Sequence, residues 1–246
     1  MEKIYETAYA KINLGLDVLG KRSDGYHEVR MVMQSVGLSD AVEIEEGEGL
    51  VVETDHSGLA GGPDNLAWKA AELLARCCGK IPNVHIRLNK KIFLAAGLAG
   101  GSSDEAAVMR GLRRLWQLDL TAPELEKLAA ELGSDIPFCI TGGTALAEGR
   151  GEILTELPEA PELLLVLAKP KLEVATGCQQ KVNQRPDIDG IIKALEQSAT
   201  GLLLESCGNV LESVTIPAHP VIAEIKQKML AAGATCALMS GSGPTV

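Results

Sequence analysis

The stretch AAGLAGGSSDEAA, residues 95–107, decides the fold of this chain. Its glycines adopt backbone conformations that other residues rarely adopt, and they allow close approach of other groups. Consecutive amide groups in such a loop converge on an anion. Ser102-x-x-Glu105 has the spacing of a capping box, so we expect a helix from about Ser103 to Trp116. The loop is therefore predicted to bind a phosphate group at the positive N-terminus of a helix.

A second glycine-rich stretch, GLDVLGKR at residues 15–22, competes for the same role. It fits the beginning of the P-loop pattern G-x-x-x-x-G-K. It then fails, because Arg22 stands where a serine or threonine must bind Mg²⁺ and because residues 23–25 continue as a turn. We interpret residues 15–22 as strand and hairpin. For residues 95–107, an ordinary glycine-rich turn followed by a well-capped helix is the alternative to a phosphate site.

Composition bounds the class of protein. The chain has 246 residues, a net charge of −10 and 3% aromatic residues, which argues against DNA or RNA as the main partner. Its longest strongly apolar run, residues 163–168, is too short to cross a membrane, and the N-terminus lacks the apolar core of a signal peptide. Six cysteines without a C-x-x-C pair favour reduced, mostly buried thiols over disulfides or a zinc site. We expect a cytoplasmic protein, either a monomer or a homodimer.

Strand and helix patterns mix along the chain and predict an α+β protein with two lobes. A proline-bearing segment at 156–162 separates an N-terminal domain, 1–157, from a C-terminal domain, 158–246. Asp64 and Thr121-x-x-Glu124 are the expected N-caps of two helices, and Gly79 and Gly133 the expected ends. We expect strands at 4–19, 30–36, 41–45, 49–53, 84–89, 163–168 and 234–239, and helices at 64–79, 103–116, 122–132, 188–207 and 220–232.

Five stretches together resemble the GHMP kinases, the family of galacto-, homoserine, mevalonate and phosphomevalonate kinases. The family's central motif is roughly P-x-x-x-G-L-G-S-S-A-A. The form G-L-A-G-G-S-S-D at 97–104 resembles one branch, the 4-diphosphocytidyl-2-C-methyl-D-erythritol kinases of the non-mevalonate isoprenoid pathway. AYAKINLG (8–15), RSDGYH (22–27) and LGSDIP (132–137) resemble the same branch in order, and SGSGPT (240–245) resembles the third GHMP motif.

The resemblance implies a two-lobed GHMP-kinase fold. Its N-terminal lobe would be like domain 2 of ribosomal protein S5, and its C-terminal lobe like ferredoxin. It implies a kinase that uses ATP with Mg²⁺ to phosphorylate the 2-hydroxyl of a small molecule carrying a cytidine diphosphate group, 4-diphosphocytidyl-2-C-methyl-D-erythritol. The alternatives are another GHMP kinase acting on homoserine, mevalonate or a sugar, and a non-catalytic nucleotide-binding protein on the same fold.

Asp135 and Lys11 have the catalytic roles that the resemblance implies. A carboxylate at Asp135, just before Pro137, can accept the proton of an attacking alcohol, and the alternative is an Asx-turn residue that caps the next segment. Lys11 lies in an otherwise apolar strand, where a cation is costly unless it is paired. Its implied role is an ammonium near Asp135 that stabilises charge in the transition state. The alternative is a strand-end lysine with its head in water.

Four residues are candidates for binding the phosphate acceptor. Asn13 shares a strand face with Lys11 and either orients the substrate hydroxyl or bonds a neighbouring backbone group. Tyr26 and His27 follow an Asp-Gly turn, and the resemblance assigns them the recognition of cytosine by stacking and by hydrogen bonds. The alternative for His27 is a surface turn residue. Thr176 resembles a threonine on the substrate side.

The nucleotide site that the resemblance implies combines the central loop with the third motif. Asn65 aligns with a residue near the adenine, and its alternative is a polar residue of a first helical turn. Ser103 is the best candidate for a Mg²⁺ ligand. The implied ATP-binding residues are Asn65, Ala95, Gly97, Leu98, Ala99, Gly100, Gly101, Ser102, Ser103, Ser240, Gly241 and Gly243.

The sequence departs from the resembled family in two places. Phe93 stands where the family usually has a proline before the loop. The sequence also stops at Val246, whereas such kinases usually continue for a few tens of residues that supply closing strands. We therefore expect the second domain to lack its final strands. The charged run at residues 148–152 is interpreted as a hairpin turn.

Overall fold

A computed structural model describes residues 3–174 and 185–246. The chain divides into two compact units, each assembled from separated segments. Unit 1 comprises Met1–Lys11, Ser35–Leu94 and Ala99–Gly142, and unit 2 comprises Ile12–Gln34, Ala95–Leu98 and Gly143–Val246. Two long strands, β1 (Lys3–Lys21) and β2 (His27–Glu46), contribute residues to both units. The predicted boundary at 156–162 falls inside unit 2, and a division of the fold at that point stays a prediction.

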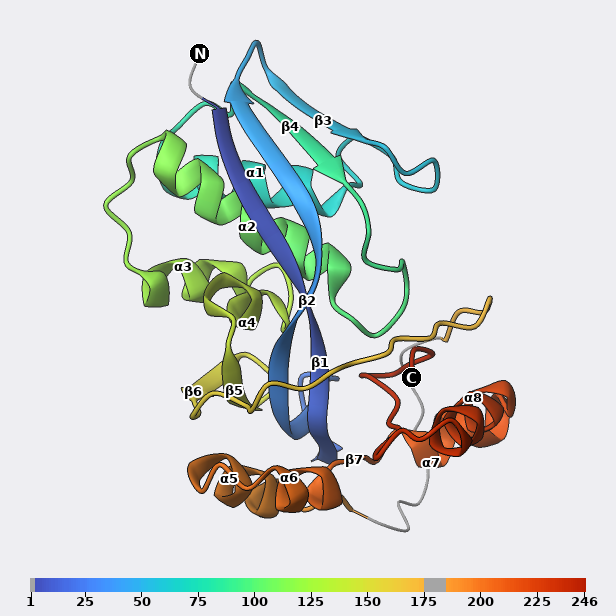
Figure 1. Ribbon diagram of the computed structural model, residues 1–246. Coiled ribbons are helices and arrows are strands. Elements are labelled where there is room, and N and C mark those ends of the chain that lie inside the picture. Colours follow the sequence, from blue (N-terminus) through green and yellow to red (C-terminus); the bar gives the residue numbers. More distant parts are fainter. Residues whose placement is uncertain (1–2, 175–184) are drawn as a thin grey trace. The chain divides into compact units, whose positions relative to one another are not determined.

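Unit 1 packs helices against one face of a sheet (Figure 1). Strand β4 (Val84–Asn89) pairs antiparallel with Ala41–Glu46 of β2 and parallel with β3 (Leu50–Thr54). The alternation predicted for 84–89 is confirmed, because every second side chain of β4 is buried. The helices of unit 1 are α1 (Leu66–Cys77), α2 (Gly100–Leu115), α3 (Ala122–Ala129) and α4 (Ile136–Thr141).

Helix α2 lies directly on the sheet because Gly111 has no side chain. A Cβ at Gly111 would come within 2.5 Å of Cδ1 of Ile44 and 3.3 Å of Cγ of Glu6. Buried apolar side chains of α1 and α2 fill the remaining space against β2 and β4. The close approach brings the polar groups of α2 within hydrogen-bonding reach of the β1 backbone.

Unit 2 builds on the other halves of β1 and β2. Strand β5 (Thr144–Glu148) pairs antiparallel with Met31–Gln34 of β2 and forms a hairpin with β6 (Ile153–Glu156), which confirms the turn predicted at 148–152. Residues 15–21 belong to β1, as the strand interpretation of that stretch predicted. Short β7 (Gly208–Asn209) runs parallel to β1. The helices of unit 2 are α5 (Ile188–Glu196), α6 (Thr200–Ser206), α7 (Glu212–Ala218) and α8 (Val221–Ala231).

Two predicted strands are absent from the described chain. Residues 163–168 are irregular, and Leu164 and Val166 are exposed. Of that run, only Ala168 exchanges backbone hydrogen bonds, with Val246. Residues 234–239 are irregular too, and the amide of Met239 donates to the Glu212 carboxylate. An apolar run becomes a strand only beside a backbone partner, which composition does not reveal.

Helix boundaries differ from the prediction in several places. The helix expected at 188–207 is two helices, α5 and α6, broken where Ser198 takes a left-handed φ of +50°. Asn65, not Asp64, caps α1, while Gly79 follows its end with a positive φ as expected. The capping box at Thr121 and Glu124 is confirmed. Helices α4 and α7 were not predicted, since each has only one or two turns and a proline.

The composition argued against a membrane span and against disulfides, and the described residues bear on both. None of their helices is both long and apolar enough to cross a membrane. The five cysteines among them are free thiols, and Cys77 is exposed, so the expectation of mostly buried thiols does not hold for that residue.

Candidate active site

The central loop enters α2 without a side-chain cap. Ala99, at the N-cap, has a left-handed φ of +55°, and the helix begins at Gly100. The predicted capping box is therefore wrong: Ser102 lies in the first turn and Glu105 is buried. The first intrahelical bond runs from the amide of Ser103 to the carbonyl of Ala99, at 2.8 Å. The three preceding amides have no carbonyl of their own helix to bind, and this arrangement suits an anion.

In unit 2 the other end of the loop contacts the third motif. Gly97 has a φ of +75°, and a Cβ there would come within 2.2 Å of the carbonyl oxygen of Ser240. The Ser240 hydroxyl donates to the carbonyl of Gly97 at 3.0 Å. Asn209 holds the motif in place, because its amide donates to the carbonyls of Met239 and Gly241 at 2.7 Å each. The structure thus brings together two stretches that the sequence predicted to bind ATP.

Unit 1 brings together the two predicted catalytic residues. Nζ of Lys11 lies 3.5 Å from Oδ2 of Asp135, with 5% of the lysine side chain exposed and 32% of the aspartate side chain. The alternative of a lysine with its head in water is therefore wrong. Asp135 occupies the N-cap position of α4, yet its side chain makes no cap hydrogen bond. The carboxylate thus faces a buried ammonium on one side and is partly open on the other.

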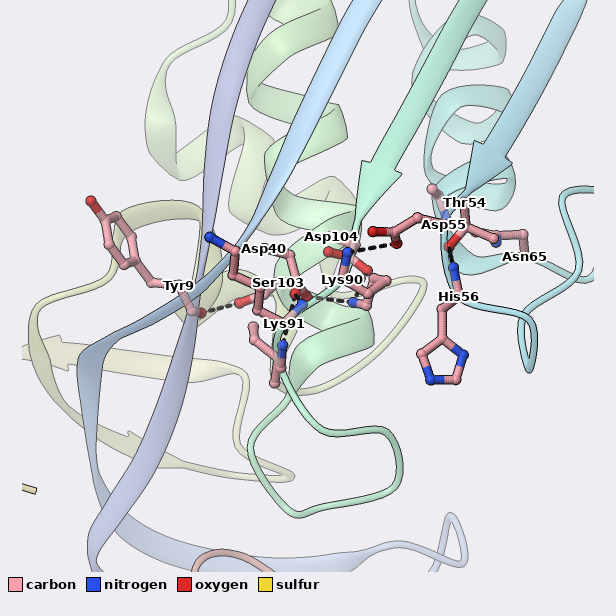
Figure 2. Close-up of polar contacts among 12 residues, drawn as sticks. Tyr9, Asp40, Thr54, Asp55, His56, Asn65, Lys90, Lys91, Ser103 and Asp104 are labelled. Carbon is pink, nitrogen blue, oxygen red and sulfur yellow. Dashed lines mark hydrogen bonds and ion pairs between the residues drawn. The ribbon is translucent and has the colours of Figure 1, made fainter. Parts of the chain in front are cut away.

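Ser103, the predicted Mg²⁺ ligand, is buried against β1. Its hydroxyl donates to the carbonyl of Tyr9 (Figure 2). It also bonds the thiol of Cys139, whose pKa burial raises to about 12. A serine hydroxyl has two acceptor lone pairs, so these contacts do not use up its capacity to bind a metal ion, although the side chain is buried. Its role as a ligand stays a prediction.

A buried ion cluster below the start of α2 was missed at the level of sequence. Nζ of Lys90 lies 2.5 Å from Oδ2 of Asp40 and also contacts the carboxylate of Asp104 (Figure 2). The three side chains are at most 5% exposed. Oδ1 of Asp40 accepts from the amide of Ile92 at 2.8 Å and from the amide of Lys91. The cluster thereby joins β2, the segment that leads into the loop, and α2.

Two carboxyl groups of α2 have raised pKa values. Burial raises the pKa of Asp104 to about 7, against the lowering effect of Lys90. Burial raises the pKa of Glu105 to about 8, against the lowering effect of Lys69 on α1. Near neutral pH, these groups carry less negative charge than ordinary carboxylates do. The N-terminus of α2 therefore repels an anion less than two fully ionised carboxylates would.

A cavity of about 180 Å³ in unit 1 lies beside this cluster. Asn65, Leu66, Lys90, Gly101 and Asp104 contribute to its wall. Asn65 is fully engaged as a cap, because its Oδ1 accepts from the amide of Ala67 and its Nδ2 donates to the carbonyl of Ala60. Oδ1 of Asp104, in contrast, is buried without a hydrogen-bond partner among the described residues. The cavity wall thus combines apolar side chains with polar ones.

Of the predicted substrate residues, Asn13 lies on β1, Tyr26 on the turn that follows it and His27 on β2. Asn13 is buried and its amide contacts the sulfur of Met31 at 3.3 Å. Tyr26 is 52% exposed, and the guanidinium of Arg150 lies 4.7 Å from its ring centroid. One ring face is thus covered by a cation. His27 is partly buried at the start of β2, and Thr176 lies outside the described residues.

Among residues 3–174 and 185–246, no group of three or more His, Cys, Asp or Glu side chains could hold a metal ion by itself. Mg²⁺ often binds proteins through one or two side chains and the phosphates of its substrate. A Mg²⁺ ion carried in with ATP therefore remains compatible with these residues.

Comparison with known proteins identifies the family. The GHMP kinases N terminal domain matches residues 65–143, and the GHMP kinases C terminal domain matches residues 183–246. A curated 4-diphosphocytidyl-2-C-methyl-D-erythritol kinase of Bacillus licheniformis is 50% identical, over 99% of this chain and 87% of that relative. The enzyme of the same name from Acetivibrio thermocellus is 46% identical, over 100% of this chain and 89% of that relative.

Solved structures agree with the sequence relatives. The crystal structure of a 4-(cytidine 5'-diphospho)-2C-methyl-D-erythritol kinase matches with a TM-score of 0.82 and 33% identity, over 98% of this chain and 88% of that chain. A homoserine kinase from Cytophaga hutchinsonii matches with a TM-score of 0.76 and 20% identity, over 100% of this chain and 84% of that chain, which shows the shared fold alone. With its α+β fold and these relatives, the chain belongs to the GHMP kinase family.

Proposed function

We propose that this chain transfers the γ-phosphoryl group of ATP to the 2-hydroxyl of 4-diphosphocytidyl-2-C-methyl-D-erythritol, a step in isoprenoid precursor biosynthesis. The observation that carries the proposal is the contact of Lys11 with Asp135, in a chain 50% identical to a kinase of that name. A partly open carboxylate can accept the proton of an alcohol, and the buried ammonium beside it can stabilise charge that develops on the transferred group.

The phosphates of ATP are assigned to the start of α2. The amides of Gly100, Gly101 and Ser102 have no carbonyl of their own helix to bind, and the helix dipole favours negative charge there. Phosphoryl transfer depends mainly on positioning and on neutralising charge, which these amides provide. The contact of Ser240 with Gly97 supports an assignment of the third motif to the same nucleotide.

The adenine is assigned to the cavity of about 180 Å³ beside Asn65. Its wall combines apolar side chains, which suit a flat ring, with polar side chains that can fix the orientation of that ring. Asn65 shapes this cavity by tying Ala60 to the first turn of α1. We therefore expect Asn65 to act on ATP affinity through the shape of the cavity.

Asp135 takes the proton of the substrate hydroxyl as its oxygen attacks the γ-phosphorus and ADP leaves. Lys11 keeps the carboxylate oriented and stabilises the charge that develops on the transferred group. Bound Mg²⁺ supplies neutralisation of phosphate charge, and Ser103 is the side chain that would hold it.

Recognition of the cytidine group is assigned to Tyr26 and His27. The free face of Tyr26 is available for stacking on a pyrimidine, because Arg150 covers the other face. Asn13 is the candidate for orienting the acceptor alcohol, and Thr176 is proposed on resemblance alone.

The test is an ADP-release assay with ATP and Mg²⁺ against a panel of alcohols. The panel holds the cytidyl substrate, the same sugar alcohol without the cytidyl group, homoserine, mevalonate and galactose. Among the panel members, we expect turnover only with the cytidyl substrate. NMR of the product should show phosphorylation at the 2-hydroxyl. Turnover of another panel member instead would overturn the substrate assignment, and ATP binding without any turnover would indicate a non-catalytic protein.

The variant Tyr26→Ala examines recognition separately. Loss of one base–aromatic stack raises KM for the cytidyl substrate by about tenfold or more, at nearly unchanged kcat. Tyr5→Ala is a matched control, because Tyr5 is also exposed but lies on the part of β1 in unit 1. An unchanged KM in Tyr26→Ala would remove Tyr26 from the substrate site.

A further inference from the structure

Helix α4 carries Asp135 but has little to hold it in place by itself. It has six residues, and no side chain caps its N-terminus. A helix this short is not stable from its own hydrogen bonds, so its position depends on tertiary contacts. The placement of the Asp135 carboxylate to within a few tenths of an ångström must therefore come from elsewhere in unit 1.

Arg110 of α2 binds the carboxyl end of α4. Its Nη1 donates to the carbonyl of Cys139 at 2.6 Å and to that of Ile140 at 3.4 Å. Carbonyls in the last turn of a helix have no partner within the helix, and a cation there also interacts favourably with the helix dipole. Arg110 thus holds α4 by the end opposite to Asp135.

The same guanidinium binds strand β1. Its Nη2 donates to the carbonyl of Thr7 at 2.8 Å, and its Nε donates to the carboxylate of Glu6 at 3.1 Å. Glu6 is 11% exposed, so the ion pair is largely shielded from water. Because a guanidinium is planar and rigid, contacts made by its two ends fix the distance between the groups they bind.

The two elements joined by Arg110 are the elements that carry the catalytic pair. Lys11 lies four residues after Thr7 on β1, and Asp135 begins the helix that Arg110 holds. Ser103, about two helical turns before Arg110 on α2, fixes the same strand at the carbonyl of Tyr9. The order of contacts along β1 is therefore Thr7, Tyr9 and then Lys11.

We propose that Arg110 is a positioning residue that sets the separation of Lys11 and Asp135 by clamping β1 to the carboxyl end of α4. The proposal rests on the catalytic roles assigned to that pair above. Arg110 itself touches neither member of the pair in the contacts described, so it acts through the two backbones that it joins.

The variant Arg110→Met removes the clamp and keeps most of the apolar stem. A displacement of about 1 Å between reacting groups can cost about 100-fold in rate. We expect kcat to fall about 10- to 100-fold, with KM for ATP and for the cytidyl substrate within about twofold of the unaltered enzyme. Rates are normalised to the fraction of enzyme that binds ATP, so that partial unfolding does not count as lost catalysis.

Arg114→Met is the matched control. Arg114 lies one turn further along α2 and binds the other oxygen of Glu6 at 2.8 Å, with 60% of its side chain exposed. Arg114 shares the anion of the clamp but none of its three backbone contacts, so kcat in Arg114→Met should stay within about twofold. Arg110→Lys keeps the charge and one or two of the contacts, and we expect an intermediate kcat. Equal losses of kcat in Arg110→Met and Arg114→Met would overturn the proposal.

Combination with Asp135→Asn separates the clamp from the assigned catalysis. If Arg110 acts through Asp135, Arg110→Met lowers kcat much less in the Asp135→Asn background than alone. Fully additive losses would overturn the clamp while leaving Asp135 as the base. Unaltered kcat in Asp135→Asn alone would instead overturn the role of Asp135, and the clamp with it.

Discussion

Unit 1 contains two buried lysines that face carboxylates, and they are built differently. Lys90 lies between Asp40 and Asp104, and all three side chains are at most 5% exposed. Lys11 lies 3.5 Å from Asp135, whose side chain is 32% exposed. The first cluster is closed to water and tight, whereas the second is loose and open on the carboxylate side.

The difference separates a structural cluster from a chemical one. Asp40 also accepts two backbone amides, so both of its oxygens are engaged and the Lys90 cluster fixes the chain before the loop. Asp135 makes no cap hydrogen bond and keeps an open side, which leaves its oxygens free to accept a proton. A general base needs an oxygen lone pair that can reach the proton. Asp40 would have to lose an existing hydrogen bond to offer one, whereas Asp135 has an open side.

The largest expected effect comes from Asp135→Asn. The amide keeps the shape of the carboxylate but cannot take a proton, so we expect kcat to fall by about 10³-fold. The free energy of unfolding should fall by about 1–2 kcal/mol, less than for a fully buried pair, because Lys11 is buried but Asp135 is partly open to water. The measurements are steady-state ADP release and urea unfolding at pH 7.5.

Asp119→Asn is the matched control, because Asp119 is a carboxylate of unit 1 outside the contacts described. Asp119→Asn should leave both kcat and the free energy of unfolding unchanged. If Asp135→Asn lost stability and kept kcat, the pair of Lys11 and Asp135 would be structural, like the Lys90 cluster, and the distinction between the two sites would be wrong.

Lys90→Met should have the opposite signature. It leaves two buried carboxylates without their cation, a situation that costs about 3–5 kcal/mol. We expect the free energy of unfolding to fall by that order, while kcat per folded molecule falls much less than in Asp135→Asn. Lys91→Met is the control, since the Lys91 side chain is exposed and only its amide binds Asp40. A stability loss below about 1 kcal/mol for Lys90→Met would show that the cluster is dispensable to the fold.

Sequence patterns predicted what is local. The alternation of 84–89, the capping box at Thr121 and the glycine loop depend on neighbouring residues, and all three are found. Lys11 and Asp135 were predicted from their motifs, and the structure brings them together. The start of α2 was placed wrongly because Ala99 takes a left-handed conformation that is uncommon for alanine.

The remaining features depend on residues far apart in the sequence. Asp40 is 50 residues from Lys90, so no spacing rule indicates their cluster. The clamp of Arg110 joins groups about 30 and about 100 residues away, and an arginine on a helix normally indicates only a solvated face. The run at 163–168 was apolar enough for a strand, but only Ala168 found a backbone partner among the described residues.

A smaller effect should appear in Glu105→Gln, as a change in the pH dependence of stability. The pKa of Glu105 is about 8 in the folded chain, above its model-compound value of 4.5, so between these values the folded state binds the proton that the unfolded state has lost. Stability therefore falls as pH rises from about 5 to about 8. Lys69 of α1 and Asp104 of α2 are the charged groups that act on Glu105, with opposite signs.

Glutamine cannot lose a proton, so Glu105→Gln should remove about 1–3 kcal/mol of the stability difference between pH 5.5 and pH 8.5. A smaller slope should remain, because the pKa of Asp104 is raised to about 7 by the same burial. Urea unfolding at both pH values measures the change. An unaltered slope would mean that Glu105 is ionised in the folded chain and that the charge near the loop is larger than we infer.

The smallest effect concerns Ser103, which stands between the two kinds of site. Ser103→Ala loses the hydrogen bond to the carbonyl of Tyr9, at a cost of about 1 kcal/mol in unfolding free energy. If the hydroxyl also holds Mg²⁺, the Mg²⁺ concentration for half-maximal rate rises several-fold. Ser57→Ala is the control, since Ser57 is an exposed serine of unit 1 that has no assigned role. An unchanged Mg²⁺ dependence in Ser103→Ala would assign Ser103 to fixing β1 next to Lys11 and remove it from the metal site.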